Sequence, residues 1–249
     1  MKGWRVLVTR PEGDDLSALL GDRGAIPLEV PMIEIRPLAA GGPLDAAARR
    51  IAAYDWIVVT SANGARALFE RLRALGVDPP SGPRWAAVGP ATAAAIESEG
   101  VRVTRVPESG TGGAIARELG ELAGARVLLP RARIASDDLP DALAALGARV
   151  DVVAAYDTVV GPESSREPLA RALDAGLQAA IFTSGSTVAG FARLAGDPSV
   201  ALADVATVCI GPVTAGALEA AGVRPSRVAA ERTPAALIEA LEEVASARA

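Results

Sequence analysis

Short runs of apolar residues alternate along the whole chain with segments in which apolar residues lie three or four positions apart. The continuous runs predict strands that are buried on both faces of a sheet. The segments with the longer period predict helices with one buried stripe. The strands expected on this basis include 4–9, 26–30, 102–106 and 126–131, and the helices include 14–22, 44–53 and 114–122.

Some helix boundaries are marked by their capping residues. Thr111 is expected to cap the helix at 114–122, and Thr233 followed by Pro234 predicts the start of the last helix. The helix after Ser61 is expected to bury one stripe, formed by Ala65, Leu68, Phe69, Leu72 and Leu75.

Two kinds of strand-to-helix junction are each present twice. Residues 56–72 and 178–194 both contain an apolar run, a Thr-Ser pair, a small residue and a helical pattern. Residues 85–96 and 207–218 both contain an apolar run, Gly-Pro, one further residue and Thr-Ala. These four junctions, which we call the corners, are the strongest functional signal in the sequence.

The corners belong to a longer internal repeat. The segment RVLVTR at 5–10 is matched by RVLLPR at 126–131, and 14–30 is matched by 137–153. The chain is therefore an internal duplication, shifted by roughly 120 residues. Strands that alternate with helices predict an α/β fold with two similar, doubly wound parallel-sheet domains.

Two arrangements of the repeat are compatible with this pattern. Each opening segment can form a domain with the corners that follow it, or the two halves can exchange their opening segments. In the exchanged arrangement, the proline-flanked connectors at 31–38 and 153–160 lie side by side as a two-stranded bridge. Periodicity alone does not choose between them.

Composition removes several kinds of chemistry. The chain has no histidine and a single cysteine, which excludes histidine triads, cysteine clusters and most catalytic zinc sites. Lys2 is the only lysine, so Schiff-base chemistry is not expected. Cys209 lies in an apolar run, which predicts a buried and inert thiol.

Charge and hydropathy indicate where the protein works. A net charge of −5 argues against a general nucleic-acid binder. The N-terminal MKGWRVLVTRP predicts a strand rather than a signal peptide, and no apolar run is long enough to span a membrane. We therefore expect a cytoplasmic protein without a membrane partner.

The corners offer a way to bind anions. Ligands of parallel α/β sheets bind at the carboxyl ends of strands, where helix N-termini present unpaired N–H groups. Hydroxyl and amide groups at the corners add further donors, and two glycines let a ligand approach the backbone; these residues are Thr60, Ser61, Asn63, Thr183, Ser184, Ser186, Gly89 and Gly211. This arrangement suits a ligand with several carboxylates. The structural alternative is that the same residues are ordinary helix caps and turns.

Three further side chains are candidates for chemistry. Tyr156 lies in the second connector, where it is either a core residue or a phenol, with a pKa of about 10, that can donate a hydrogen bond. Arg10 and Arg131 follow equivalent strands and are either surface ion-pair partners or carboxylate ligands. The acidic pairs at 14–15 and 137–138 are expected to be helix-start charges.

These motifs together resemble the uroporphyrinogen-III synthase family. The resemblance rests on VLVTRP, PMIEI, TSANG, TSGST, VGPATA, IGPVTA and the tyrosine in AAYDT, and it covers essentially the whole chain. It implies two α/β domains joined by a two-stranded antiparallel linker, which favours the exchanged arrangement. The expected boundaries are 1–32 plus 160–249 for the first domain, 39–153 for the second, and 33–38 and 154–159 for the linker strands.

The resemblance also implies an activity. Members of this family are lyases that cyclise the linear tetrapyrrole hydroxymethylbilane, with loss of water and inversion of ring D through a spiro intermediate, and they need no metal or cofactor. Tyr156 matches the family tyrosine thought to assist departure of hydroxide. We expect a monomer that closes its domains on the substrate and docks transiently with hydroxymethylbilane synthase. The expected substrate-binding residues are Arg10, Thr60, Ser61, Ala62, Asn63, Gly89, Thr92, Arg131, Thr183, Ser184, Gly185, Ser186, Gly211 and Thr214.

Two other functions are compatible with duplicated α/β lobes. One is a non-catalytic bilobed binding protein for a polycarboxylate small molecule, although the N-terminus does not predict the signal peptide usual for a periplasmic binder. The other is a partner protein in tetrapyrrole regulation. Both differ from the enzyme in lacking turnover.

Overall fold

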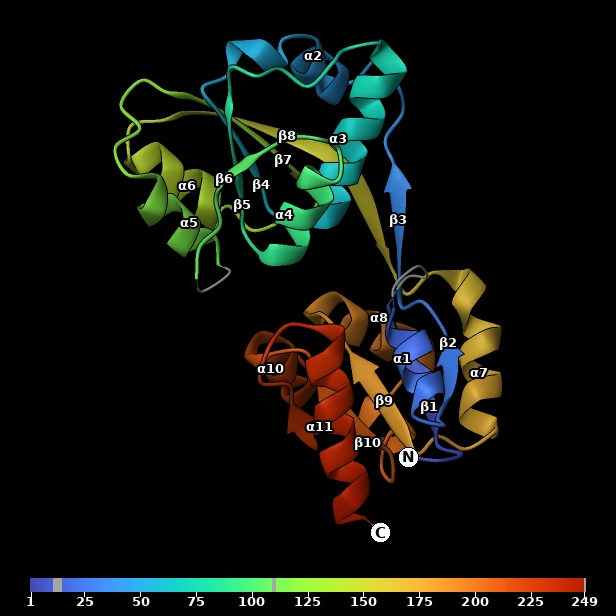
Figure 1. Cartoon of the computed structure of the whole chain (residues 1–249). Coiled ribbons are helices and arrows are strands. Elements are labelled where there is room, and N and C mark those ends of the chain that lie inside the picture. Colours follow the sequence, from blue (N-terminus) through green and yellow to red (C-terminus); the bar gives the residue numbers. More distant parts are fainter. Residues whose placement is uncertain (11–14, 109–110, 249) are drawn as a thin grey trace. The chain divides into compact units, whose positions relative to one another are not determined.

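The computed structural model of the protein describes residues 1–10, 15–108 and 111–248, and these form two compact units. Unit 1 combines Met1–Glu34 with Val159–Ala249, and unit 2 is Ile35–Thr158. The chain passes between the units twice, within strand β3 (Ile33–Pro37) and within strand β8 (Arg149–Val160) (Figure 1). Unit 1 is therefore built from both ends of the chain.

Unit 1 contains a five-stranded parallel sheet in the order β11-β10-β9-β1-β2. Its strands are β1 (Arg5–Val8), β2 (Ile26–Glu29), β9 (Ala179–Phe182), β10 (Ala206–Cys209) and β11 (Arg227–Val228). Pairing of β1 with β9 joins the first opening segment to the second pair of corners.

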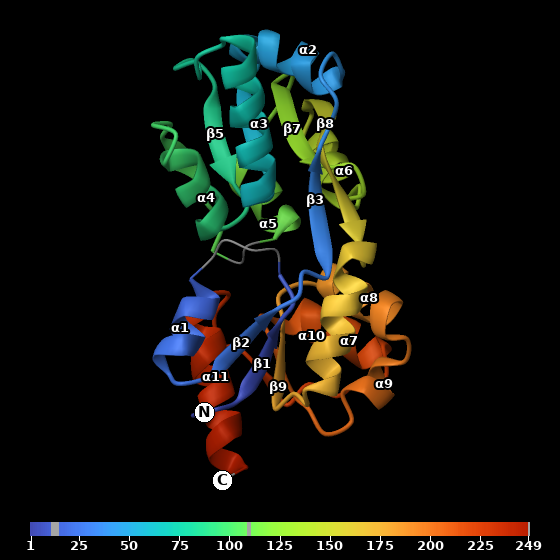
Figure 2. The same cartoon turned by 90° about the vertical axis from the view of Figure 1, so that its right-hand side faces the viewer.

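Helices cover both faces of the unit 1 sheet, as Figure 2 shows. One face is covered by α1 (Leu16–Asp22) and α11 (Pro234–Ala247), and the other by α7 (Arg166–Asp174), α8 (Gly185–Ala195), α9 (Pro198–Ala201) and α10 (Pro212–Ala220). A 3₁₀ turn at Glu163–Ser165 precedes α7. Successive strand residues point to opposite faces, so Val6 packs in the first core and Leu7 in the second.

Unit 2 contains a six-stranded sheet in the order β3-β8-β7-β4-β5-β6. Its remaining strands are β4 (Trp56–Val59), β5 (Arg84–Ala87), β6 (Val103–Arg105) and β7 (Arg126–Ala132). The five strands from β8 to β6 are parallel. Strand β3 lies at the edge beside β8 and runs in the opposite direction (Figure 1).

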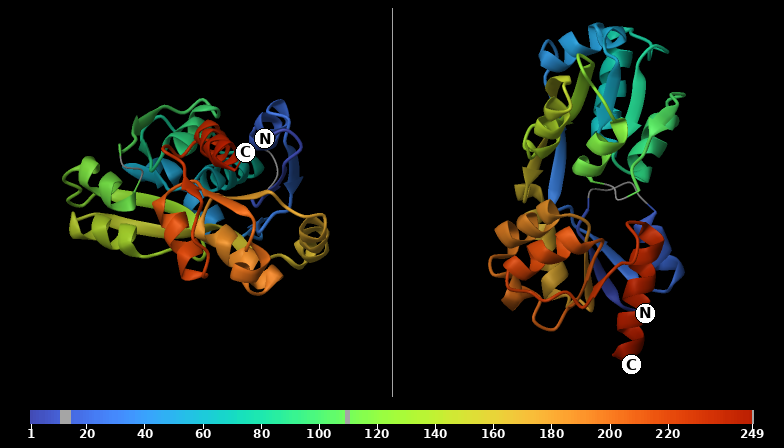
Figure 3. Two further views of the ribbon diagram at one scale, coloured as in Figure 1. Left: turned by 90° about the horizontal axis from the view of Figure 1, so that it is seen from below. Right: turned by 90° about the vertical axis from the view of Figure 1, so that its left-hand side faces the viewer.

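The unit 2 sheet is also covered on both faces (Figure 3). One face packs against α2 (Pro43–Arg49), a 3₁₀ turn (Ile51–Ala53), α3 (Ala62–Leu75) and α4 (Pro90–Glu97), and the other against α5 (Gly112–Leu119) and α6 (Asp138–Ala145). Phe69 of α3 stacks on Trp85 with ring centroids 5.4 Å apart. The expected stripe of α3 is buried as far as Leu72, and Leu75 is partly buried.

The α/β class with two parallel sheets is as the sequence predicts. The caps at Thr111 and Thr233 are confirmed, since their hydroxyls accept hydrogen bonds from Ala114 N–H and Ala236 N–H. The helix expected at 44–53 instead ends at Arg49 and continues as the 3₁₀ turn. Asp14 lies outside the described residues.

The second connector differs from the prediction. Residues 149–160 form one continuous strand, β8, rather than a strand followed by a separate connector. Its first part pairs with β7 as far as Tyr156, and β3 pairs with its other edge. Backbone hydrogen bonding to two neighbours thus keeps the chain extended through the segment.

Candidate functional site

The first pair of corners lies side by side at the carboxyl edge of the unit 2 sheet. Strands β4 and β5 end in register, at Val59 and Ala87, and Val88 N–H donates to Val59 O at 3.0 Å. The chain then turns into α3 after Ser61 and into α4 after Gly89. Thr60, Ser61, Ala62, Asn63 and Gly89 are partly exposed, whereas Thr92 is buried.

Ser61 links the first corner to Tyr156. The Ser61 Oγ accepts a hydrogen bond from Gly64 N–H at 3.1 Å and so caps α3. The same oxygen lies 3.0 Å from the Tyr156 hydroxyl, and either oxygen can be the donor of that bond. Tyr156 is carried by β8 at the point where pairing with β7 ends, and its carbonyl accepts from Arg133 N–H at 2.9 Å. Two strand pairings therefore place the phenol against the helix cap.

Burial controls the protonation of Tyr156. The residue is 7% exposed. Burial raises the pKa of the phenol above its usual value, and the hydrogen bond with Ser61 offsets part of this effect. The hydroxyl is consequently neutral at physiological pH and is able to donate a proton.

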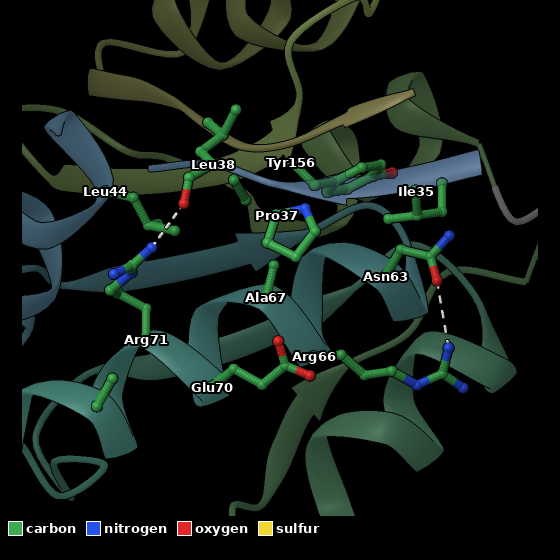
Figure 4. Close-up of a pocket in the computed structure, with 12 residues that line it drawn as sticks. Ile35, Pro37, Leu38, Leu44, Asn63, Arg66, Ala67, Glu70, Arg71 and Tyr156 are labelled. Carbon is green, nitrogen blue, oxygen red and sulfur yellow. Dashed lines mark hydrogen bonds between the residues drawn. The ribbon is translucent and has the colours of Figure 1, made fainter. Parts of the chain in front are cut away.

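A pocket of about 370 Å³ lies beside Tyr156 within unit 2. Figure 4 shows Ile35, Pro37 and Tyr156 on one side of it and Ala67, Glu70 and Arg71 of α3 on the other. The remaining lining residues are Leu38, Leu44, Asn63, Arg66, Ala74 and Ala155. The pocket thus has an apolar wall from β3 and β8 and a mixed wall from α3.

The charged residues of this pocket differ in how they are bonded and in how exposed they are. Arg71 is held by an ion pair with Asp45 at 3.1 Å and by the carbonyl of Leu38 at 2.8 Å. Both partners of the pair are largely buried, so Arg71 fixes the segment after β3. Arg66 is exposed and donates to Asn63 Oδ1 at 3.2 Å, and Glu70 is exposed on the same helix.

Sequence reasoning singled out Asn63 but missed the rest of the pocket wall on α3. Its members lie at 63, 66, 67, 70, 71 and 74, which is the spacing of one helical face. That spacing could have been recognised as a shared face. It does not show that the face borders a pocket, because the opposite wall comes from β3 and β8.

Arg131 lies within β7 rather than after the strand as expected, and its side chain is engaged by the loop that follows β7. It is 8% exposed, and its guanidinium donates to Ser136 O and to Asp137 Oδ1. These bonds close the loop between β7 and α6, and they use donors that a substrate carboxylate would need.

The second pair of corners lies at the carboxyl edge of the unit 1 sheet. Strands β9 and β10 end in register, and Ile210 N–H donates to Phe182 O at 3.0 Å. The predicted residues at this edge are Thr183, Ser184, Gly185, Ser186, Gly211 and Thr214; the first four are at least partly exposed, and the last two are buried. Arg10 follows the adjacent β1 and is partly exposed.

Ser184 has a different environment from Ser61. Its Oγ accepts from Thr187 N–H at 3.2 Å, and Thr187 Oγ1 accepts from Ser184 N–H at 3.3 Å. This reciprocal pair is a capping box, which satisfies two of the unpaired N–H donors at the helix start. Capping accounts for these two hydrogen bonds at this corner.

The structure also bears on other chemistries. Cys209 is fully buried, and burial, reinforced by Glu219, raises the pKa of its thiol to about 12, so it is not a nucleophile. Among the described residues, no three His, Cys, Asp or Glu side chains are grouped so that they could hold a metal ion. In the same part of the chain, no helix combines the length and the apolar character that crossing a membrane requires.

Comparison with known proteins gives a consistent result. The family model described as "HEM4: Uroporphyrinogen-III synthase HemD" matches residues 14–239. The chain is 33% identical over 97% of its length to "Porphyrin biosynthesis protein HemD" of Ruminiclostridium josui, although it spans only 49% of that longer protein. It is 31% identical to "Uroporphyrinogen-III synthase" of Synechococcus elongatus, over 85% of this chain and 84% of that protein.

A solved structure shares the fold. A mutant uroporphyrinogen III synthase from the extremely thermophilic bacterium Thermus thermophilus superposes with a TM-score of 0.70, covering 98% of this chain and 99% of that chain at 24% identity. At this identity, the likeness speaks for the fold, which agrees with the α/β architecture described above.

Proposed function

Because the chain belongs to the uroporphyrinogen-III synthase family, we propose that it cyclises hydroxymethylbilane to uroporphyrinogen III. The reaction loses water and inverts ring D, which makes the protein a lyase of tetrapyrrole biosynthesis. The observation that carries this proposal is the neutral Tyr156 hydroxyl, held against the cap of α3 beside a pocket.

The reaction begins with departure of the substrate hydroxyl. Electron release from the pyrrole nitrogen breaks the bond between the methylene carbon and the hydroxyl oxygen, and Tyr156 protonates that oxygen so that water leaves. The resulting azafulvene is attacked by the substituted carbon of ring D, which gives a spiro intermediate. This intermediate opens and recloses with ring D inverted, and the proton lost in the final closure returns to the Tyr156 phenolate.

We assign binding of the substrate carboxylates to the corners. The helices that start there, α3, α4, α8 and α10, direct their N-termini and backbone N–H groups toward the carboxyl edges of their sheets. The partly exposed Thr60, Asn63 and Thr183 add polar side chains to these edges. Eight substrate carboxylates require many such donors, and neutral donors hold them without a fixed pairing to single cations.

The wider setting follows from the same proposal. The enzyme works in the cytoplasm as a monomer, without metal or cofactor, and docks transiently with hydroxymethylbilane synthase. Its two domains are 1–32 plus 160–249 and 39–153, with 33–38 and 154–159 as linker strands. Binding of one substrate by the corners of both units stays a prediction from the sequence.

Product isomer composition tests the proposal. Hydroxymethylbilane is generated in situ from porphobilinogen, the protein is added, and the oxidised porphyrins are separated by chromatography. The expected product is mainly the type III isomer, because uncatalysed closure gives type I. Type I at the background rate from folded protein would refute the proposal and favour a polycarboxylate-binding protein.

The role of Tyr156 is tested by a matched pair of variants. Tyr156→Phe is expected to lower kcat roughly tenfold to hundredfold, since water can replace a general acid in part. Tyr54→Phe is the control because Tyr54 is the only other tyrosine, and its hydroxyl bonds to Asp151. Equal kcat values for Tyr156→Phe and the wild type would show that the Tyr156 hydroxyl takes no part in the reaction.

A further inference from the structure

The bonds of Ser61 leave its proton free for Tyr156. A serine hydroxyl has one proton to donate and two lone pairs that can accept. One lone pair accepts from Gly64 N–H at 3.1 Å, and the Tyr156 hydroxyl lies 3.0 Å away. If Ser61 donates this hydrogen bond to the tyrosine oxygen, the proton of the phenol is not used between the two hydroxyls. The phenol can then donate that proton to another acceptor.

We infer that Ser61 is a positioning residue, which donates a hydrogen bond to the Tyr156 oxygen and directs the phenol proton toward the leaving hydroxyl of the substrate. This inference rests on the proposed synthase function and adds a residue role to it. When Tyr156 gives its proton to the leaving oxygen, the phenolate that remains keeps the hydrogen bond from Ser61. The proton lost from ring D restores the phenol, so no further acid or base is consumed.

The duplicated corner shows that capping alone does not require this contact. Ser184 caps α8 with the same geometry, and its capping partner is Thr187, the third residue of the helix. The corresponding third residue of α3 is Gly64, which has no side chain to complete a capping box. A Cβ at Gly64 would lie 3.2 Å from Pro130 O and 3.3 Å from Ser61 Oγ. Both serine hydroxyls accept a hydrogen bond from the N–H of the third helical residue, so the contact with Tyr156 is an additional bond of Ser61 that capping does not need.

Charged groups around Tyr156 could also influence its titration. On the elements packed against it these are Arg66, Glu70 and Arg71 of α3, Arg131 and Arg133 at the end of β7, and Glu34 and Arg36 of β3. Arg71, Arg131 and Arg133 are paired with Asp45, Asp137 and Asp157. Ser61 is the group in hydrogen-bond contact with the phenol, so its removal is the specific perturbation.

Ser61→Gly removes the hydroxyl with little loss of capping, because glycine is a nearly adequate N-cap. We expect kcat to fall roughly fivefold, with KM unchanged. Ser61→Thr keeps both the hydroxyl and the cap and is expected to restore kcat. In a Tyr156→Phe background, Ser61→Gly should change kcat by less than twofold, since the two groups act as a unit. Thr233→Ala, which removes the cap of α11, controls for a loss of capping elsewhere.

A spectroscopic titration separates this inference from the proposed function. In a Tyr54→Phe background, Tyr156 is the only tyrosine, so phenolate absorbance reports its pKa directly. Ser61→Gly should raise that pKa, because the phenolate loses a donor. An unchanged pKa, or an equal fall of kcat with and without the Tyr156 hydroxyl, would overturn the inference. A raised pKa in a protein that makes only the type I isomer would instead refute the synthase function and leave the hydrogen bond established.

Discussion

Helix α8 passes so close to the backbone before β3 that Gly190 cannot carry a side chain. A Cβ at this position would lie 2.0 Å from Met32 O and 2.8 Å from Met32 C. Met32 cannot easily move away, since its N–H donates to Thr9 O at 2.9 Å and its carbonyl accepts from Gly161 N–H at 2.8 Å. Gly190→Ala is therefore expected to destabilise unit 1.

The size of the effect follows from these distances. Carbon atoms in good contact lie about 3.5–4.0 Å apart, so α8 and the Met32 backbone must separate by roughly 1 Å. Overpacking of this kind costs about 1–3 kcal/mol. Loss of the Gly161–Met32 hydrogen bond adds about 0.5–1.5 kcal/mol. We expect a total of about 2–4 kcal/mol, which lowers Tm by roughly 5–12 °C in a chain of this size.

Thermal and urea unfolding followed by circular dichroism measure the change. The matched control is Gly216→Ala in α10, where an added Cβ meets no atom within 4 Å. Because alanine favours helices, this control should gain about 0.5–1 kcal/mol. A Gly190→Ala variant as stable as the wild type would refute the close approach of α8 to Met32.

Three further outcomes are expected. Cys209 should resist thiol reagents in the native protein and react once urea has unfolded it, because burial raises its pKa to about 12; rapid native labelling would contradict this. Leu68→Ala, at a fully buried position, should lower the free energy of unfolding by about 2–5 kcal/mol, whereas Val213→Ala, at 73% exposure, should leave urea unfolding within about 0.5 kcal/mol of the wild type. The pKa values of Tyr54 and Tyr156 are raised from 10.0, mainly by burial. The folded state thus holds these protons more tightly than the unfolded state. The contribution of the two tyrosines to the free energy of unfolding should therefore be fully present below pH 10 and be lost above it as the folded tyrosines titrate. Melting temperatures that rise across that range would contradict the assignment.

Local signals predicted most of the secondary structure. Thr111 and Thr233 are recognisable as caps because their hydroxyls bond to N–H groups three residues away in the chain. The two Thr-Ser corners are recognisable for the same reason, since Ser61 and Ser184 cap α3 and α8. The continuity of β8 was not predictable from local pattern, because that strand also pairs with β3, more than a hundred residues earlier.

The site was predictable in its residues and not in their contacts. Tyr156 and Ser61 could each be singled out from the sequence, but they are 95 positions apart. Their contact depends on where the pairing of β8 with β7 ends and on where α3 begins. Arg131 illustrates the same limit, since the repeat aligns it with Arg10, whereas its place within β7 and its bonds to Ser136 and Asp137 depend on strand pairing and on a loop conformation.

The duplication explains why the motif alone is a poor guide to chemistry. Both Thr-Ser corners keep a serine that caps a helix, so capping is what the two copies share. They differ at the third helical residue, where the Thr187 side chain accepts a hydrogen bond from the backbone N–H of Ser184 in one copy and Gly64 has no side chain in the other. Among the hydrogen bonds described for the two corners, only Ser61 contacts a tyrosine. The repeated residues therefore supply the helix starts, and the strand pairing that places Tyr156 beside Ser61 distinguishes the serine that we propose takes part in proton transfer.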